Sequence, residues 1–186
     1  MRQGFDVSIN DYNRNLFTVF KTVLEQKDGE SPAHVLLKVL AATLYYDPGI
    51  VIEPNDVDPQ YRPDLLIRRI DGFPATWIEC GNVRTVKLDK LTSRYVDAQV
   101  VVVKKIAREI RDLKERCEKD VRRPYNLTYV AFDKDFVDRA ASHVMGRNDC
   151  TAIISDNTLQ FLMNGFDATT PLHRESHEAK DRKSVV

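Results

Sequence analysis

The chain has 186 residues, of which 42% are hydrophobic and 30% charged, and its 28 basic side chains balance its 28 acidic ones. This length suits one domain that buries a core without disulfides, and zero net charge gives no general reason to expect nucleic acid. No apolar run approaches the roughly 20 residues that cross a bilayer. The three cysteines form no C-x-x-C pair, which disfavours a zinc site. With no secretory signal pattern, we expect a cytoplasmic protein without a membrane partner, and the oligomeric state stays open.

The first quarter of the chain is expected to form a hairpin followed by a helix. FDVSIN and LFTVFKTVL alternate apolar and polar residues around the turn-forming DYNRN, which predicts two antiparallel strands. In SPAHVLLKVLAATLYY, the serine is a candidate N-cap and the proline takes the first helical position. The Asp-Pro-Gly at 47–49 then ends the predicted helix.

The middle of the chain predicts strands joined by one helical crossover. Three short runs, GIVIE, YRPDLLIRRI and ATWIEC, predict successive strands between residues 49 and 80. VRTVKLDKLTSRY spaces its apolar residues as a helix does, and the β-branched AQVVVV predicts another strand. A strand, a helix and a strand in this order favour a parallel crossover unit.

The C-terminal part is expected to complete a single domain over residues 1–172. It predicts a charged surface helix in KIAREIRDLKERCEKD, a strand in NLTYVAF, a helix in KDFVDRAASHVM and a hairpin formed by CTAII and TLQFLM. The last fourteen residues, 173–186, predict a disordered tail. The expected fold class is therefore α/β (α+β).

Charge is unevenly distributed along the chain. Residues 84–123 carry thirteen basic and seven acidic side chains, so this segment has a net charge of +6 and the rest of the chain −6. Such a segment can hold a nucleic-acid backbone electrostatically. The candidate nucleic-acid contacts are Arg84, Lys104, Lys105 and Arg108.

Asp64 and Glu79 lie in the two strands around Asp71-Gly72. A two-residue turn there pairs residues whose numbers sum to 143, which places Asp64 opposite Glu79. A four-residue turn would make them diagonal neighbours on the same face, and a three-residue turn would separate them. On the first two registers the carboxylates repel each other, and a divalent cation with its preference for hard oxygen ligands would offset that repulsion.

Each of these residues also has a structural interpretation. Asp64, which follows a proline, could be a turn residue, and Glu79 could cap the next helix. Trp77 shares the predicted face of Glu79 and could either stack on a nucleic-acid base or be buried against a helix.

The spacing Pro63-Asp64, fourteen residues, then Glu79-x-Gly81 resembles the PD-(D/E)-x-K nuclease superfamily, and more specifically the YaeQ family. The likeness extends over almost the whole chain, through VSINDYNRNLFTVF, KVLAATL, RPDLLI, WIECGN, KLTSRYVDAQVVVV, NLTYVAF and CTAIISDNTLQFLM. It implies a restriction-endonuclease-like core, in which helices flank a mixed central sheet, with N-terminal and C-terminal β-hairpins added.

The resemblance also implies the site. Asp64 and Glu79 would hold Mg²⁺ or Mn²⁺, with the carbonyl of Cys80 as a further ligand and Glu30 as the third acid. The superfamily's lysine, two residues after the glutamate, is replaced here by Gly81. The candidates for a relocated lysine are Lys90, the better positional match, and Lys87; either could instead be a solvated lysine on a helix face.

Two functions follow as hypotheses. The first is a Mg²⁺-dependent nuclease that hydrolyses phosphodiester bonds of DNA or RNA with a metal-activated water. The second is a catalytically inactive protein of the same fold that binds nucleic acid or protein. Loss of the in-line lysine favours the second hypothesis, and retention of both acids favours the first.

Overall fold

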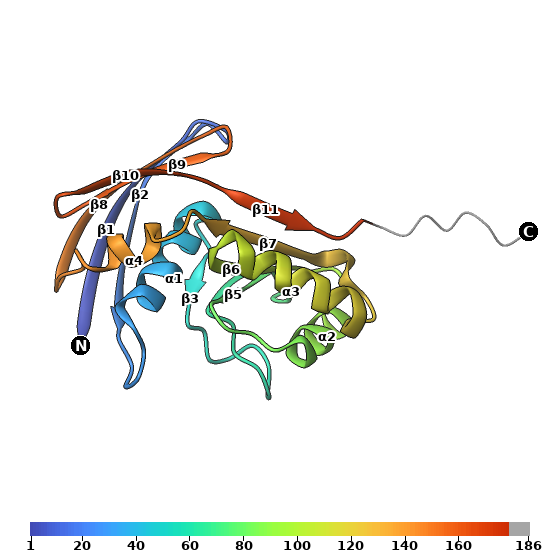
Figure 1. Cartoon of the computed structure of the whole chain (residues 1–186). Coiled ribbons are helices and arrows are strands. Elements are labelled where there is room, and N and C mark those ends of the chain that lie inside the picture. Colours follow the sequence, from blue (N-terminus) through green and yellow to red (C-terminus); the bar gives the residue numbers. More distant parts are fainter. Residues whose placement is uncertain (179–186) are drawn as a thin grey trace, which may run out of the picture.

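The computed structural model describes residues 1–178 (Figure 1). Its strands are β1 (Arg2–Asp11), β2 (Leu16–Glu25), β3 (Val51–Ile52), β4 (Leu65–Arg68), β5 (Pro74–Cys80), β6 (Gln99–Ile106), β7 (Leu127–Phe132), β8 (Arg147–Ser155), β9 (Thr158–Met163), β10 (Phe166–Pro171) and β11 (His173–Ser176). Its helices are α1 (Pro32–Leu44), α2 (Thr85–Arg94), α3 (Ala107–Asp120) and α4 (Phe136–Ala141), with a 3-10 turn η1 (Pro124–Asn126). Within residues 1–178, no helix combines the length and apolar character that a membrane span needs.

The N-terminal and C-terminal hairpins form one five-stranded sheet. Its strand order is β10-β9-β8-β1-β2, with the predicted hairpins β1–β2 and β8–β9 both confirmed. A parallel pairing of β1 with β8 joins them. Alternation in β1 points Phe5, Val7 and Ile9 into the core, so one face of the sheet is buried.

The second sheet has six strands in the order β11-β7-β6-β5-β4-β3. The predicted crossover is confirmed, since β5 and β6 pair in parallel on either side of α2. The run VVVV of β6 is buried on both faces, as is typical of a parallel strand between two helical layers. Glu79 lies near the carboxyl end of β5, opposite Val102 of β6.

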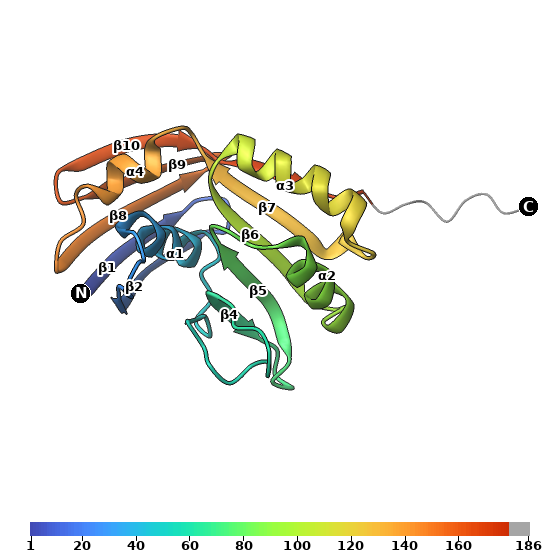
Figure 2. The same cartoon turned by 60° about the horizontal axis from the view of Figure 1, so that its bottom comes forward.

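Four helices cover these sheets in two layers. Figure 2 shows α1 and α4 over the five-stranded sheet, and α2 and α3 over the six-stranded sheet. α1 begins as predicted, with Ser31 accepting the N–H of His34, and almost all its residues are buried because its core cluster draws on both sheets. A second core cluster lies under α2 and α3, on the other face of β5 and β6.

The predicted N-terminal and C-terminal hairpins are present, and the parallel pairing of β1 with β8 joins them into a sheet of their own. The predicted tail begins too early: residues 173–176 form β11, which pairs antiparallel with β7, and Figure 1 shows this strand continuing from β10 into the other sheet. Residues 179–186 of that predicted tail lie outside the described residues.

Candidate functional site

The β4–β5 hairpin has the predicted register beside the carboxylates but not the predicted turn. From Leu65–Ile78 to Ile67–Thr76, paired residues have numbers that sum to 143, as expected. The predicted two-residue turn is wrong, because the register shifts after Ile67 and the N–H of Arg69 bonds the carbonyl of Phe73 at 2.8 Å. The irregularity lies on the turn side of these pairs, so it leaves the predicted register around the carboxylates intact.

Asp64 lies one residue before β4 and points toward α1. Its Oδ2 accepts the N–H of Cys80 at 2.7 Å, and its Oδ1 lies 3.8 Å from Nε2 of His34 and 4.0 Å from Nζ of Lys38. Burial alone would raise the pKa of Asp64, but the His34 imidazole, the Cys80 N–H and the Lys38 charge outweigh it and lower the pKa. Asp64 is therefore held as an anion.

Glu79 points toward α2 and is almost entirely buried. Its Oε1 accepts hydrogen bonds from Nε1 of Trp77 at 2.7 Å and lies 2.6 Å from Nζ of Lys87. Burial raises the pKa of Glu79, and the charge of Asp64 adds to this, so the pKa stays raised in spite of Lys87 and Trp77. Trp77 is fully buried and stacks on Tyr95 at 5.5 Å, which confirms burial rather than base stacking.

The two carboxylates take their cationic neighbours from different helices, His34 and Lys38 of α1 for Asp64 and Lys87 of α2 for Glu79. Ile78 and Cys80 pack with α1, whereas Trp77 packs with α2, so the helices contacted by Asp64 and Glu79 lie on opposite faces of β5. Each acid still keeps one oxygen, Oδ1 of Asp64 and Oε2 of Glu79, that accepts no hydrogen bond from residues 1–178. The side chain of Asp64 is 22% exposed and that of Glu79 only 7%.

Lys87, rather than Lys90, reaches Glu79. Besides Glu79, its Nζ bonds the carbonyl of Arg62 at 3.2 Å and lies 5.9 Å from the ring centroid of Tyr61. Lys90 is exposed, and its side chain makes no hydrogen bond or ion pair within residues 1–178. Lys87 also lines a surface depression of about 360 Å³ with Tyr61, Asn82, Val83, Arg84 and Val86. The N-cap of α2 is Arg84, so neither Glu79 nor Asn82 caps this helix.

Gly81 stands where the resemblance to PD-(D/E)-x-K nucleases led us to look for a lysine, and its surroundings favour a glycine. Its φ of +76° is a conformation that side chains rarely adopt, and an added Cβ would lie 3.0 Å from Nδ1 of His34. α1 has brought an imidazole into the space that a side chain at position 81 would enter.

A buried ion cluster next to Asp64 was missed by the sequence reasoning. Nζ of Lys38, whose side chain is 3% exposed, bonds Glu30 and Glu53, the latter at 2.6 Å. Burial alone would lower the pKa of Lys38, but these bonds and the Asp64 charge raise it. The sequence signal for this cluster was a histidine and a lysine four residues apart, His34 and Lys38, inside an otherwise apolar helix.

Glu30, the candidate third acid, takes part in this cluster. Its Oε1 accepts from Lys38 and its Oε2 accepts the N–H of Lys27 at 3.0 Å. Across residues 1–178, no three or more His, Cys, Asp or Glu side chains are grouped as a metal-binding cluster. The thiol of Cys80 is fully buried, and burial together with the charges of Asp64 and Glu79 raises its pKa, so only its carbonyl remains a candidate ligand.

The predicted nucleic-acid contacts separate into two groups. Arg84 is exposed in the depression that Lys87 lines, and Arg108 is largely exposed, 3.6 Å from Asp112. Lys104 is 5% exposed, so it cannot contact a nucleic-acid backbone, and Lys105 pairs with Asp138 at 2.9 Å. Much of the positive charge of residues 84–123 is compensated in the same way.

The chain was compared with known families and structures. Residues 3–171 match the model of the YaeQ protein family. The crystal structure of YaeQ protein from Xanthomonas axonopodis pv. citri is similar, with 18% identity, a TM-score of 0.77, and coverage of 95% of this chain and 98% of that one. The YaeQ protein from Pseudomonas syringae gives 16% identity and a TM-score of 0.80, with coverage of 96% and 97%. No curated protein sequence matches. Because the family match spans most of its length, this chain belongs to the YaeQ family.

Proposed function

We propose that the chain is a divalent-metal-dependent phosphodiesterase of the PD-(D/E)-x-K type that acts on DNA or RNA. Asp64 Oδ1, Glu79 Oε2 and the carbonyl of Cys80 would hold Mg²⁺ or Mn²⁺ at the carboxyl end of β5. A metal bound there would supply Lewis-acid polarisation of a phosphate and a more acidic water.

One observation carries this proposal. Two carboxylates, Asp64 just before β4 and Glu79 in β5, each keep one oxygen that accepts no hydrogen bond within residues 1–178, next to the same residue, Cys80. Anionic oxygens are the ligands that Mg²⁺ prefers, commonly one or two carboxylates together with water and phosphate. Burial raises the pKa of Glu79 in spite of Lys87, and a bound cation would favour the ionised carboxylate.

Further support comes from the element order and the adjacent depression. A helix, the two acid-bearing strands, a crossover helix and a parallel strand follow one another as α1, β4, β5, α2 and β6, the order expected for a restriction-endonuclease-like core. The depression next to Glu79 presents Lys87 and Arg84 together with the ring of Tyr61. Two cations and an aromatic ring suit a phosphate and its attached nucleotide.

Lys87 is assigned the role of the missing in-line lysine. Its ammonium lies against Glu79 and reaches the depression, so it can steady a phosphate oxygen whose negative charge grows in the transition state. One observation favours the non-catalytic alternative: Glu79 is paired with Lys87, and Lys38 lies beside Asp64, so both acids have a cationic neighbour without any metal.

Calorimetric titration with Mn²⁺ tests the metal site. The wild type is expected to bind, and Asp64→Asn and Glu79→Gln to weaken binding strongly, because each neutralises one of the two carboxylates. Asp56→Asn is the matched control, since Asp56 is a largely exposed carboxylate paired with Arg68. Identical isotherms for all four proteins would overturn the site.

A cleavage assay then separates the two functions. With Mn²⁺ and single- or double-stranded DNA or RNA, Lys87→Ala should lower the rate by roughly 10²- to 10³-fold, as loss of a charge-stabilising donor typically does. Lys90→Ala, on the same helix, is the control and should leave the rate unchanged. Metal binding without cleavage of any substrate would select the binding module, and equal effects of both variants would remove Lys87 from its role.

A further inference from the structure

The edge strand β2 presents an unpaired edge and an exposed apolar face. β2 ends the five-stranded sheet, and among residues 1–178 no strand other than β1 pairs with it. On its outer face Phe17, Val19 and Val23 are 53%, 55% and 53% exposed, and the ring of Tyr12 packs edge-on against Phe17 at 5.3 Å. A ten-residue edge with free main-chain groups and apolar side chains is a template for pairing with another strand.

The order of residues in β2 favours a second copy of β2 as the strand that pairs with this edge. The side chains that face the core side are Leu16, Thr18, Phe20, Thr22 and Leu24. This order reads the same in both directions, with Phe20 at its centre. On the outer face, Phe17 and Val23 lie symmetrically about Phe20, and both are apolar. A two-fold symmetric interface requires a surface that is complementary to itself, and the inner face of β2 meets this requirement.

Only one register of self-pairing uses this symmetry. Directly opposite residues of antiparallel strands share a face, so a two-fold axis perpendicular to the sheet must pass through one residue pair. With the axis at Lys21, two lysines would face each other, and with the axis at Val19, Phe17 would face a lysine. With the axis at Phe20, the two phenylalanines meet, each threonine faces a threonine, and each leucine faces a leucine.

The charges are compatible with this register as well. Lys21 is already paired with Asp6 of β1 at 3.0 Å. With the axis at Phe20, Lys21 faces Val19 of the second copy rather than another cation. Aromatic pairs and threonine pairs directly across antiparallel strands each contribute favourably.

We propose that β2 pairs antiparallel with β2 of a second copy of this chain, across a two-fold axis at Phe20, so that two five-stranded sheets become one continuous sheet. The interface is independent of the proposed metal site, because Asp64 and Glu79 lie in the other sheet.

Sedimentation across about 1 to 100 µM tests the dimer through charge. Val19→Lys places a lysine opposite Lys21 twice per dimer, and two like-charge pairs should raise the dissociation constant about tenfold. Val19→Glu instead places a carboxylate opposite Lys21, so its dissociation constant should stay at or below that of the wild type. Val86→Lys, an equally apolar and exposed position on α2, is the control and should change nothing. A wild type that stays monomeric at 100 µM, or equal effects of the two lysine variants, would overturn the proposal.

Cysteine cross-linking under a mild oxidant tests the register. With the axis at Phe20, the double variant Val19→Cys/Lys21→Cys brings unlike positions together and should cross-link two copies. Either single variant should cross-link slowly, because each would meet itself only if the axis lay at Val19 or at Lys21. The three native cysteines are buried, so they should form few cross-links of their own. Single variants that cross-link as fast as the double variant would refute this interface.

Discussion

Gly81 and His34 share one small space at the end of β5. The glycine adopts a left-handed conformation there, and an added Cβ would lie 3.0 Å from Nδ1 of His34. Both features disfavour a lysine, or any other side chain, at this position. The positive charge near the acids comes instead from two helices, with Lys38 on α1 and Lys87 on α2.

Substitution of Gly81 by alanine should measure the combined cost of the positive φ and of the contact with His34. We expect Gly81→Ala to lower the free energy of unfolding by about 1 to 3 kcal/mol, because it adds a strained φ and a contact with His34. Gly72→Ala is the control: Gly72 also has a positive φ, of +85°, but an added Cβ would meet nothing within 4 Å. In a His34→Ala background, the cost of Gly81→Ala should fall toward that of Gly72→Ala. Urea unfolding of the wild type, Gly81→Ala, His34→Ala and the double variant forms a double-mutant cycle. Additive changes in the free energy of unfolding would contradict the contact between position 81 and His34.

α1 connects the candidate site to the rest of the fold. It packs between the two sheets, and its one buried lysine bonds Glu30 before the helix and Glu53 after β3, with Asp64 before β4 nearby. Lys38 thereby joins three segments that lie far apart in sequence. The helix therefore positions Asp64 as well as burying apolar surface.

Loss of the Lys38 charge should be costly. Lys38→Met would leave Glu30 and Glu53 without their buried counter-charge, and breaking a buried pair by removal of one partner costs roughly 3 to 5 kcal/mol. Lys27→Met removes an exposed lysine from the same Glu53 and should cost less than about 1 kcal/mol. Midpoints of urea unfolding would compare the two variants. Similar shifts of the unfolding midpoint for both variants would mean that the burial of Lys38 adds nothing to the stability that its ion pairs contribute.

The elements that the sequence predicts well are those with strong local patterns. The β4–β5 register was expected from a turn at Asp71-Gly72, and Leu65 with Ile78 and Leu66 with Trp77 pair as that turn requires. The wider turn at 69–73 and the shift after Ile67 have no comparable local signal. The direction of Asp64 depends on α1, which packs against β5 only in the folded molecule. The sequence alone therefore could not predict the direction of the Asp64 side chain.

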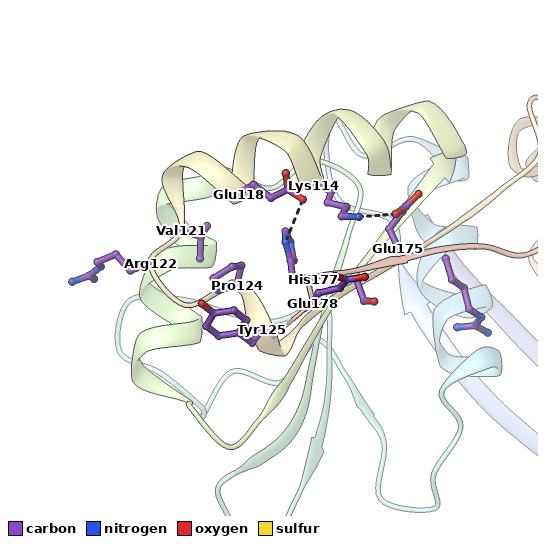
Figure 3. Close-up of a pocket in the computed structure, with 11 residues that line it drawn as sticks. Lys114, Glu118, Val121, Arg122, Pro124, Tyr125, Glu175, His177 and Glu178 are labelled. Carbon is purple, nitrogen blue, oxygen red and sulfur yellow. Dashed lines mark hydrogen bonds and ion pairs between the residues drawn. The ribbon is translucent and has the colours of Figure 1, made fainter. Parts of the chain in front are cut away.

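At the scale of the whole molecule, the C-terminal segment links the two sheets. β10 belongs to the five-stranded sheet and β11 to the six-stranded one, with only Leu172 between them. Short polar strands such as His173–Ser176 resemble a tail in sequence, because their apolar content is low and their pairing with β7 is non-local. The imidazole of His177 then lies against β7 and α3, at a cleft of about 760 Å³ (Figure 3).

His177 gives this link a pH dependence. Its side chain is 3% exposed, its Nε2 lies 2.8 Å from the hydroxyl of Tyr129 on β7, and its Nδ1 lies 3.8 Å from Glu118 of α3. Burial lowers the pKa of His177; Lys114 acts in the same direction, and Glu118 and Glu175 oppose it. Below pH 6.5, the ordinary pKa of histidine, His177 takes up a proton in the unfolded chain. In the folded chain its lowered pKa disfavours this protonation.

The stability contributed by His177 is therefore present above pH 6.5 and lost as the pH falls below it. Relative to wild type, His177→Gln should lose less free energy of unfolding between pH 7 and pH 5.5, with a difference of at most about 1.4 kcal/mol per pH unit. His173→Gln, on the neighbouring strand where His173 bonds Asp133 at 2.7 Å, is the control. Urea unfolding at each pH measures the difference. Parallel pH profiles for wild type and His177→Gln would show that His177 binds its proton equally well in the folded and the unfolded chain, which would contradict a lowered pKa in the folded state.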